Sequence, residues 1–204
     1  MIGIIDYGLG NIGAFVNVYK RMNIQAKVAK SAQDLAGITR VILPGVGAFD
    51  HAMQLLNASG MRQPLDELVA HGRTPVLGIC VGMQILAQSS DEGSLPGLGY
   101  VQGSVKGFAN AAKCAALPLP HMGWNDVVPQ KGLPLFRGLE DDARFYFLHS
   151  FYFDCASEDS SAASATYGID FSCAVKSASV FGVQFHPEKS HHWGAMLLKN
   201  FAEI

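Results

Sequence analysis

The stretch Pro75-Val76-Leu77-Gly78-Ile79-Cys80-Val81-Gly82-Met83-Gln84 runs from an apolar segment into a helix-like one, with a cysteine at the junction. The apolar segment predicts a buried strand that ends at Ile79, and the residues after the cysteine predict a helix. A sharp turn between the two requires small neighbours, which Gly78 and Gly82 supply. Cys80 is then a candidate nucleophile, because the first N–H groups and the dipole of the helix favour its thiolate. The same pattern also fits an inert, buried cysteine at an ordinary junction.

Short apolar runs alternate with helical patterns on both sides of this stretch. They predict strands at 2–5, 26–29, 40–43, 145–148, 174–176 and 180–184, and helices at 12–22, 49–56, 83–87 and 193–202. In the second half the strands follow one another without long helices between them, which favours antiparallel pairing. We therefore predict an α/β fold with a mostly parallel central sheet flanked by helices and an antiparallel C-terminal extension. In such sheets, ligands bind at the carboxyl ends of the parallel strands.

Length and composition restrict the classes of protein that fit. A chain of 204 residues suits one domain, which we expect to span 1–204. Hydrophobic residues make up 49% and charged residues 16%, which argues against disorder and hints at an apolar partner face. The net charge of −2 excludes a strongly basic surface for nucleic acid. The apolar run at 1–5 is stopped by Asp6, too early for a signal peptide or a membrane span, so we expect a cytoplasmic protein without membrane contact.

The glycine-rich opening and the cysteines bear on cofactors. The segment Gly8-Leu9-Gly10-Asn11-Ile12-Gly13 matches a dinucleotide-binding fingerprint. That fingerprint requires an acidic residue at the end of the second strand, where Lys30 and Ser31 stand instead. A tight turn capped by Asn11 explains the glycines as well, so we favour the turn and expect no cofactor. We expect neither a metal site nor disulfides from the widely spaced cysteines, which are Cys80, Cys114, Cys155 and Cys173.

A second motif, Gln184-Phe185-His186-Pro187-Glu188, offers the partners that a cysteine nucleophile needs. An imidazole takes the thiol proton, and a carboxylate fixes the tautomer of that imidazole. Pro187 argues against a helical course, and in an extended segment residues two apart lie on the same side, so Glu188 can support the ring of His186. Taken singly, His186 could be a core or surface histidine, and Glu188 a carboxylate at the start of the last helix. Together with Cys80, they predict a catalytic triad.

Attack on an acyl carbon also requires hydrogen-bond donors for the developing oxyanion. The N–H of Val81, directly after the nucleophile, is one candidate. The turn Gly45-Val46-Gly47 after the third strand is another, because its glycines let successive N–H groups form a concave nest. An ordinary β-to-α turn would look the same in isolation. Its place at the same sheet edge as Cys80 favours an oxyanion hole formed by Val46, Gly47 and Val81.

These motifs resemble those of the class I, triad-type glutamine amidotransferases. The blocks that carry the likeness span nearly the whole chain: they are Ile5-Asp6-Tyr7-Gly8, Gly10-Asn11, Leu43-Pro44-Gly45-Val46-Gly47, Gly78 to Gln84, His121-Met122-Gly123-Trp124-Asn125, Phe147-Leu148-His149-Ser150 and Gly182 to Ser190. Within that class, the chain is most similar to the glutaminase subunits of imidazole glycerol phosphate synthase. The resemblance implies a flavodoxin-like fold over the whole chain.

The resemblance also implies a reaction in two halves. Cys80 would attack the carboxamide of L-glutamine, His186 would pass the proton to the departing ammonia, and water would then release glutamate. The ammonia would go to a (β/α)₈-barrel cyclase subunit, which forms a heterodimer with the glutaminase and makes imidazole glycerol phosphate and AICAR in histidine biosynthesis. These 204 residues contain no synthase domain, so we expect the acceptor enzyme on another polypeptide.

Further residues are assigned by the same resemblance. Gln84 and Glu92 would contact the amino-acid end of glutamine, since a carboxylate suits the α-ammonium. Gly45, His149 and Ser150 would line the same pocket. Each of these polar side chains could instead be an ordinary surface residue, and a lone tryptophan is more often core than interface. With that alternative open, the residues expected to face the partner are Asn11, His121, Trp124 and Asn125.

Two departures from the family pattern leave rival functions open. Gly13 and Ala14 stand where many members carry bulkier or basic residues, and the segment 190–193 is unusual. Both touch the expected docking face, so the ammonia could serve a different synthase, for example one that aminates a sugar for surface polysaccharide. A free-standing cysteine hydrolase of similar fold would act without a partner. An inactive binding module is the third alternative, and the intact triad argues against it.

Overall fold

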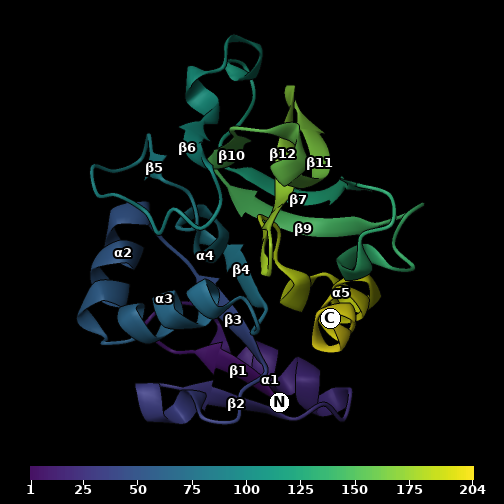
Figure 1. Ribbon diagram of the computed structural model, residues 1–204. Coiled ribbons are helices and arrows are strands. Elements are labelled where there is room, and N and C mark those ends of the chain that lie inside the picture. Colours follow the sequence, from purple (N-terminus) through teal and green to yellow (C-terminus); the bar gives the residue numbers. More distant parts are fainter.

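The alternation of apolar runs and helical patterns folds, as predicted, into parallel strands connected by helices (Figure 1). The computed structural model describes residues 1–204. Its strands are β1 (Ile2–Ile5), β2 (Ala26–Ala29), β3 (Arg40–Gly45), β4 (Val76–Cys80), β5 (Ser89–Ser90), β6 (Gly103–Gly107), β7 (His121–Asp126), β8 (Val128–Pro129), β9 (Arg144–His149), β10 (Phe151–Cys155), β11 (Ser161–Tyr167), β12 (Ile169–Ser177) and β13 (Val180–Val183). Its α-helices are α1 (Ile12–Arg21), α2 (Phe49–Ala58), α3 (Arg62–His71), α4 (Val81–Gln84) and α5 (His191–Glu203). None of these helices is long and apolar enough to span a membrane.

The main sheet changes from parallel to antiparallel at β13. It contains 11 strands, and its main path runs β2-β1-β3-β4-β13-β12-β10-β6-β5. From β2 to β13 all neighbours are parallel, whereas β12 runs antiparallel to β13 and begins the second half. A separate antiparallel pair, β7 and β9, lies beside this second half. The predicted parallel sheet with an antiparallel C-terminal extension is confirmed, and β4 lies inside the parallel part between β3 and β13.

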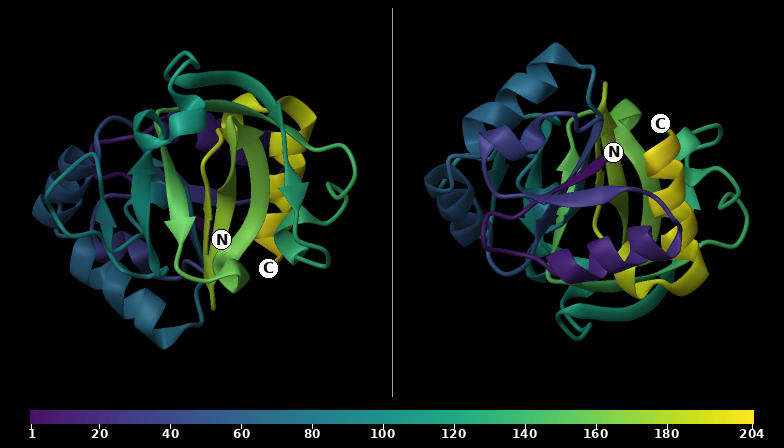
Figure 2. Two further views of the ribbon diagram at one scale, coloured as in Figure 1. Left: turned by 90° about the horizontal axis from the view of Figure 1, so that it is seen from above. Right: turned by 90° about the horizontal axis from the view of Figure 1, so that it is seen from below.

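Helices cover both faces of the parallel strands (Figures 1 and 2). On one face lie α2 and α3, and on the other α1 and α5 lie side by side. The hydroxyl group of Tyr19 in α1 donates a hydrogen bond of 3.2 Å to the carbonyl oxygen of Leu198 in α5. The last helix is thereby tied to the first βα unit, and the sheet between the two helix layers is shielded from water.

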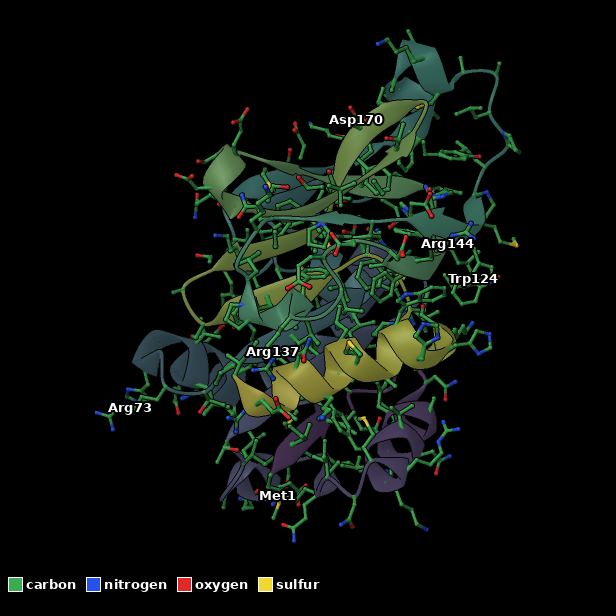
Figure 3. The ribbon with its side chains drawn as sticks, turned by 90° about the vertical axis from the view of Figure 1, so that its right-hand side faces the viewer. Met1, Arg73, Trp124, Arg137, Arg144 and Asp170 are labelled. Atoms are coloured by element: carbon green, nitrogen blue, oxygen red, sulfur yellow. The ribbon has the colours of Figure 1, made fainter.

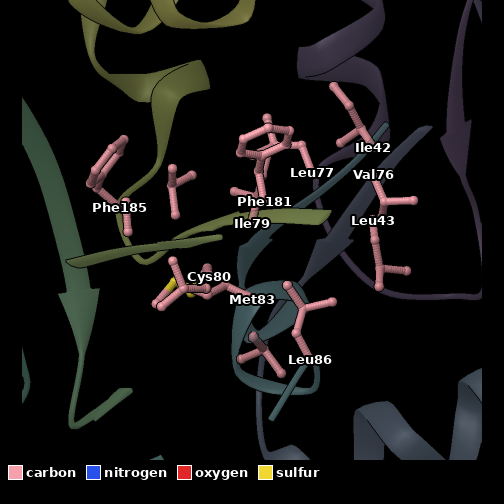
Figure 4. Close-up of a cluster of buried hydrophobic side chains, with 14 of the residues drawn as sticks. Ile42, Leu43, Val76, Leu77, Ile79, Cys80, Met83, Leu86, Phe181 and Phe185 are labelled. Carbon is pink, nitrogen blue, oxygen red and sulfur yellow. The ribbon is translucent and has the colours of Figure 1, made fainter. Parts of the chain in front are cut away.

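The strands around β4 form the centre of the hydrophobic core (Figure 4). Both β4 and β13 are buried along their whole length, as expected for parallel strands with helices on both faces. Leu43 and Leu77 are fully buried, and Phe181 is nearly so. Figure 4 shows Cys80 at the end of this cluster, next to Met83. The backbone that carries Cys80 therefore rests on closely packed and rigid neighbours.

Two helices differ from what the sequence predicts. The helix expected at 83–87 is the shorter α4, because the carbonyl groups of Ile85, Leu86 and Ala87 accept hydrogen bonds from the backbone of the later segment 98–101. A helix of 4 residues has a small dipole, so its support for a thiolate is weaker than expected. The second difference is α3, which the pattern of apolar residues does not predict. Its apolar pattern is weak, since Leu65 is its only buried residue.

Candidate active site

Cys80 is the last residue of β4 and the N-cap of α4, and it lies on a sharp turn. Its φ of 56° and ψ of −117° lie in a region that residues with a side chain rarely adopt. Strain of this kind costs about 1–3 kcal/mol and persists only where the surrounding structure enforces it. The strand, the strained residue and the helix together make the nucleophile elbow that the sequence predicts. The residue is 5% exposed, so the elbow points into a protected space.

The glycines beside Cys80 are required by close backbone contacts. A Cβ atom at Gly82 would overlap the carbonyl oxygen of Leu43 on β3. A Cβ atom at Gly78 would overlap the carbonyl oxygen of Gly82. Backbone atoms in a packed core cannot move aside as the end of a flexible side chain can. The Gly-x-Cys-x-Gly spacing is therefore needed to pack α4 against β3.

His186 and Glu188 lie next to each other, as predicted. Nδ1 of His186 is 2.9 Å from Oε1 of Glu188, and the two side chains are 10% and 3% exposed. The segment is not extended, however: Pro187 occupies the first position of a short 3₁₀ turn, where its missing N–H costs nothing, and the turn brings Glu188 back to the ring. Ser190 holds this turn, since its hydroxyl donates to the carbonyl of His186 at 2.6 Å and accepts from the N–H of Tyr146 at 3.0 Å.

The surroundings of His186 favour its protonated form. Burial alone disfavours an imidazolium, but hydrogen bonds with Cys80 and Glu188 and the charges of these groups outweigh it and raise the pKa of His186 to about 9. The ring is therefore positively charged at neutral pH. A positive charge beside Cys80 stabilises negative charge on the sulfur, which is the state in which a cysteine attacks.

Cys80 and His186 open into one cavity of about 340 Å³. The predicted residues that line it are Val46, Gly47, Val81, Gln84, Glu92, His149 and Ser150. Gly45 lies behind the wall, where its Cα packs against Val81 and Gly82. The lining residues that the sequence analysis does not single out are Pro120, Leu148, Phe151 and Lys189. All four lie within or directly next to a quoted motif, so proximity to a motif is the signal that could have found them.

Gln184 is a further residue at this site that the sequence analysis leaves without a role. It is fully buried, and its Nε2 lies 3.8 Å from Sγ of Cys80. Its Oε1 accepts a hydrogen bond of 3.0 Å from Nε2 of Gln84. The same Nε2 of Gln84 lies 3.4 Å from the carbonyl oxygen of Phe151. Amide groups thus connect the sulfur to the wall of the cavity. The signal available in the sequence was the position of Gln184, two residues before the triad histidine.

Glu92 has a structural partner at the cavity wall. Its Oε2 accepts a hydrogen bond of 2.8 Å from the N–H of Phe49, the first residue of α2. A carboxylate at this position satisfies a free backbone donor and complements the helix dipole. The predicted contact of Glu92 with an α-ammonium group would be an additional role, and it stays a prediction.

The residues predicted to face a partner occupy different environments. Asn11 is exposed and caps α1 through its Oδ1, as the tight-turn interpretation of the glycine-rich opening requires. Trp124 is 39% exposed and stacks on His191, with 5.3 Å between ring centroids; Figure 3 shows it at the edge of the molecule beside α5. Asn125 is half-buried. His121 is only 4% exposed, so its ring offers little surface to a partner, and the predicted contact stays a prediction.

The site is arranged for attack by a thiolate on an acyl carbon, and the fold that carries it is an α/β sheet with the nucleophile at a strand end. The fold and the site thus define an α/β protein with a cysteine nucleophile. Residues 3–204 match the family model "Glutamine amidotransferase class-I". The chain belongs to this family.

Relatives and solved structures agree with this assignment. The chain is 63% identical to a protein of Bdellovibrio bacteriovorus named imidazole glycerol phosphate synthase subunit HisH, over 100% of both chains. It is 50% identical to a protein of Leptospira interrogans with the same name, again over 100% of both chains. A solved structure described as a glutamine amidotransferase superposes with a TM-score of 0.77 at 22% identity, covering 99% of this chain and 97% of the other. At that identity, the superposition supports the fold alone.

Proposed function

We propose that this chain is a glutaminase subunit, which hydrolyses L-glutamine to glutamate and ammonia and passes the ammonia to a synthase on a separate chain. The observation that carries this proposal is the strained Cys80, which opens into one cavity with His186, whose ring is paired with Glu188. Membership of the glutamine amidotransferase family supplies the substrate class. We take residues 1–204 to act as one domain, and we place it in the cytoplasm with its biosynthetic partner.

The proposed reaction begins with attack of the Cys80 sulfur on the carboxamide carbon of glutamine. The oxyanion would be held by backbone N–H groups of Val46, Gly47 and Val81. His186 would donate its proton to the leaving nitrogen, so that ammonia departs and a thioester remains. His186 would then accept a proton from water, which attacks the thioester and releases glutamate with a free thiol. Glu188 would hold the ring in the correct tautomer throughout.

The wall of the cavity would bind the amino-acid end of glutamine. Gln84, Glu92 and Ser150 offer polar groups on the lining, and Gly45 gives the wall its shape through close backbone packing. Both ring nitrogens of His149 are already hydrogen-bonded to protein groups, so His149 would bound the pocket through its ring and not through a nitrogen. A cavity of about 340 Å³ is of the right order for a small amino acid.

For the partner we propose a (β/α)₈-barrel cyclase, with which the chain forms a heterodimer that makes imidazole glycerol phosphate and AICAR in histidine biosynthesis. The support is the identity of 63% over both full lengths with a protein named as a subunit of imidazole glycerol phosphate synthase. Met122 and Trp124 on β7 are 60% and 39% exposed, and they give the docking face apolar contact area.

The first test separates the two halves of the reaction. In the complex with the cyclase, Cys80→Ala is expected to abolish glutamine-dependent synthesis and to leave synthesis from added ammonium intact. Cys155→Ala is the matched control, because this half-buried thiol lies outside the cavity and should leave both rates unchanged. Loss of both rates in Cys80→Ala would mean that Cys80 holds structure, and the proposal would be wrong.

The second test addresses the partner. Purified chain alone should hydrolyse glutamine slowly, and an equimolar amount of cyclase should accelerate it. Full activity without a partner would favour a free-standing hydrolase. Capture of a sugar-aminating synthase from native lysate, with no response to the cyclase, would contradict the histidine-pathway assignment.

A further inference from the structure

Two buried histidines stand directly opposite each other on β7 and β9. His121 and His149 are paired residues in the antiparallel register, and they are 4% and 6% exposed. Nδ1 of His121 lies 2.9 Å from Nε2 of His149. His149 lines the cavity of Cys80, whereas His121 lies one strand further away. The proposed reaction does not use this pair, although burying two imidazoles carries a cost.

The hydrogen-bond partners at the two ends determine which nitrogen carries each proton. Nδ1 of His149 lies 2.7 Å from the carbonyl oxygen of Phe151, which can only accept, so this nitrogen carries the proton. Nε2 of His149 then accepts, and Nδ1 of His121 must donate to it. At the far end, Nδ2 of Asn125 lies 3.3 Å from Nε2 of His121 and donates to it. The amide of Asn125 is oriented by Thr166 and Asp126, since its Nδ2 donates to a carbonyl and its Oδ1 accepts a backbone N–H.

The surroundings hold both rings neutral and fixed. The ring of His121 is stacked between those of Phe147 and Tyr167, with centroid distances of 4.8 and 4.2 Å. Phe108, Phe147 and Phe171 surround His149. Burial lowers the pKa of His121 to about 4 and that of His149 to about 3. Every donor in the chain from Asn125 to Phe151 therefore points the same way at neutral pH.

The chain of hydrogen bonds ends at a group that the active site shares. The carbonyl oxygen of Phe151 also receives Nε2 of Gln84, which donates to Gln184, whose amide nitrogen faces the sulfur of Cys80. Gln84 and Phe151 both line the cavity. The position of this one carbonyl thus depends on His149 on one side and shapes the substrate wall on the other.

We propose that His121 is a positioning residue for glutamine binding, which acts through His149 on the Phe151 carbonyl and on Gln84. This inference rests on the proposed glutaminase function and names a determinant of the same site. Loss of the His121 donor leaves Nε2 of His149 buried without a partner, so the ring can turn and release the Phe151 carbonyl. A pair that only fills space would not depend on the hydrogen bond.

The test uses two substitutions at one position. His121→Phe keeps an aromatic ring between Phe147 and Tyr167 but has no donor, whereas His121→Asn places an amide nitrogen near the position of Nδ1. In the complex, we expect His121→Phe to raise the KM for glutamine about tenfold, which is the effect of one hydrogen bond of about 1.4 kcal/mol. We expect His121→Asn to stay within about threefold of the unchanged chain. Synthesis from added ammonium should be the same in both, which shows that the complex is assembled.

Tyr167→Phe is the matched control, since it keeps the ring stacked on His121 and removes only a hydroxyl bonded to Pro118. Its KM for glutamine should not change. An unchanged KM in a folded His121→Phe chain would overturn the proposal. An equal rise in KM in His121→Phe and His121→Asn would also overturn the proposal, because the donor that only His121→Asn keeps would then have no effect.

A spectroscopic readout is independent of glutamine turnover. At pH 7, long-range ¹H–¹⁵N correlations of the isolated chain should show both rings neutral, with Nδ1 protonated in each. In His121→Phe the remaining ring of His149 should lose this single tautomer. Protonated Nε2 atoms in the unchanged chain would overturn the role of His121, even if the chain is a glutaminase. A chain that shows the expected tautomers but hydrolyses no glutamine would overturn the proposed function and with it this role, while the structural assignment of the pair would stand.

Discussion

The parallel strands that carry Cys80 and the antiparallel strands that carry His121 and His149 meet at one cavity, and they hold their side chains in different ways. In the parallel half, β4 and α4 place the nucleophile through backbone contacts at Gly78 and Gly82 that leave no room for a side chain. In the antiparallel half, hydrogen bonds between side chains and carbonyl groups place the histidines. Close contacts do not depend on pH, whereas a histidine hydrogen bond does.

The difference teaches which part of the site can be adjusted. A backbone held by sterics has one conformation, and a change there costs fold stability before it costs activity. A side chain held by hydrogen bonds can lose its orientation while the fold remains intact. Substitutions in the two regions should therefore affect different observables.

Apart from loss of the nucleophile itself, the largest effect on activity is expected from Glu188→Gln, which changes a side chain that acts through a hydrogen bond. The amide can still accept from His186, but it removes the negative charge that supports the imidazolium. We expect kcat for glutamine to fall about 10³-fold, or about 4 kcal/mol in activation free energy, with little change in melting temperature. Stopped-assay rates of glutamate release by the complex measure this. A loss below about tenfold would mean that Glu188 does not support the ring.

The largest effect on stability is expected from Gly82→Ala on the steric side. The new methyl group overlaps the carbonyl oxygen of Leu43, and no flexible atom can move aside. We expect urea unfolding to show a loss of about 3 kcal/mol, or an unfolded chain. Gly13→Ala is the control, because no atom lies within 4 Å of its added Cβ and the position is inside a helix. It should be neutral or stabilise by up to about 1 kcal/mol, and equal behaviour of the two variants would contradict the steric explanation.

The histidine pair should make the fold sensitive to acid. The pKa values of His121 and His149 are lowered to about 4 and about 3 from 6.5, so the unfolded chain binds protons that the folded chain excludes. This stability is complete above pH 6.5 and falls with decreasing pH by about 1.4 kcal/mol per pH unit for each ring. Burial is the main cause for His149, and the positive charges that His121 and His186 carry when protonated lower the pKa of His149 further.

Urea unfolding at several pH values between about 4.5 and 6.5 measures this slope. His121→Phe should remove about half of the slope. His186 does not contribute in this window. Its pKa is raised to about 9, so it changes stability only between pH 6.5 and 9, where stability falls as pH rises. An unchanged acid slope in His121→Phe would show that the ring is not held neutral.

The smallest effect on stability is expected from Glu92→Gln. Glu92 caps α2 by a hydrogen bond and also lines the cavity. The amide oxygen can still accept from the N–H of Phe49, but it no longer complements the dipole of α2. We expect a stability loss below about 1 kcal/mol. If Glu92 also binds the α-ammonium group, the KM for glutamine should rise about tenfold in the same variant. An unchanged KM would assign Glu92 to the helix cap alone.

The steric half of the site could be predicted from sequence, because its cause is local. Gly78 and Gly82 stand two residues from Cys80, and their spacing reports the turn directly. His186 and Glu188 are also close in sequence, so their contact was predicted correctly although the backbone makes a 3₁₀ turn. Local spacing was enough in both cases.

The hydrogen-bonded half could not be predicted, because its partners are distant in the chain. His121 and His149 are 28 residues apart and meet only through the register of β7 with β9. Gln84 and Gln184 are 100 residues apart. The early end of α4 has the same kind of cause, since residues from 98 onward take the carbonyl groups that a longer helix would use. No local pattern carries such information.

The positive φ at Cys80 sets the stability of the fold against catalysis. Glycine would adopt a φ of 56° without strain, so Cys80→Gly would relieve about 1–3 kcal/mol, set against the lost packing of one small side chain. Selection for catalysis alone keeps a side chain at this position. A copy of this chain that is released from making ammonia but still needed for assembly with its partner would be free to drift toward glycine here. Glycine at this position in an otherwise intact relative would mark the loss of the glutaminase reaction.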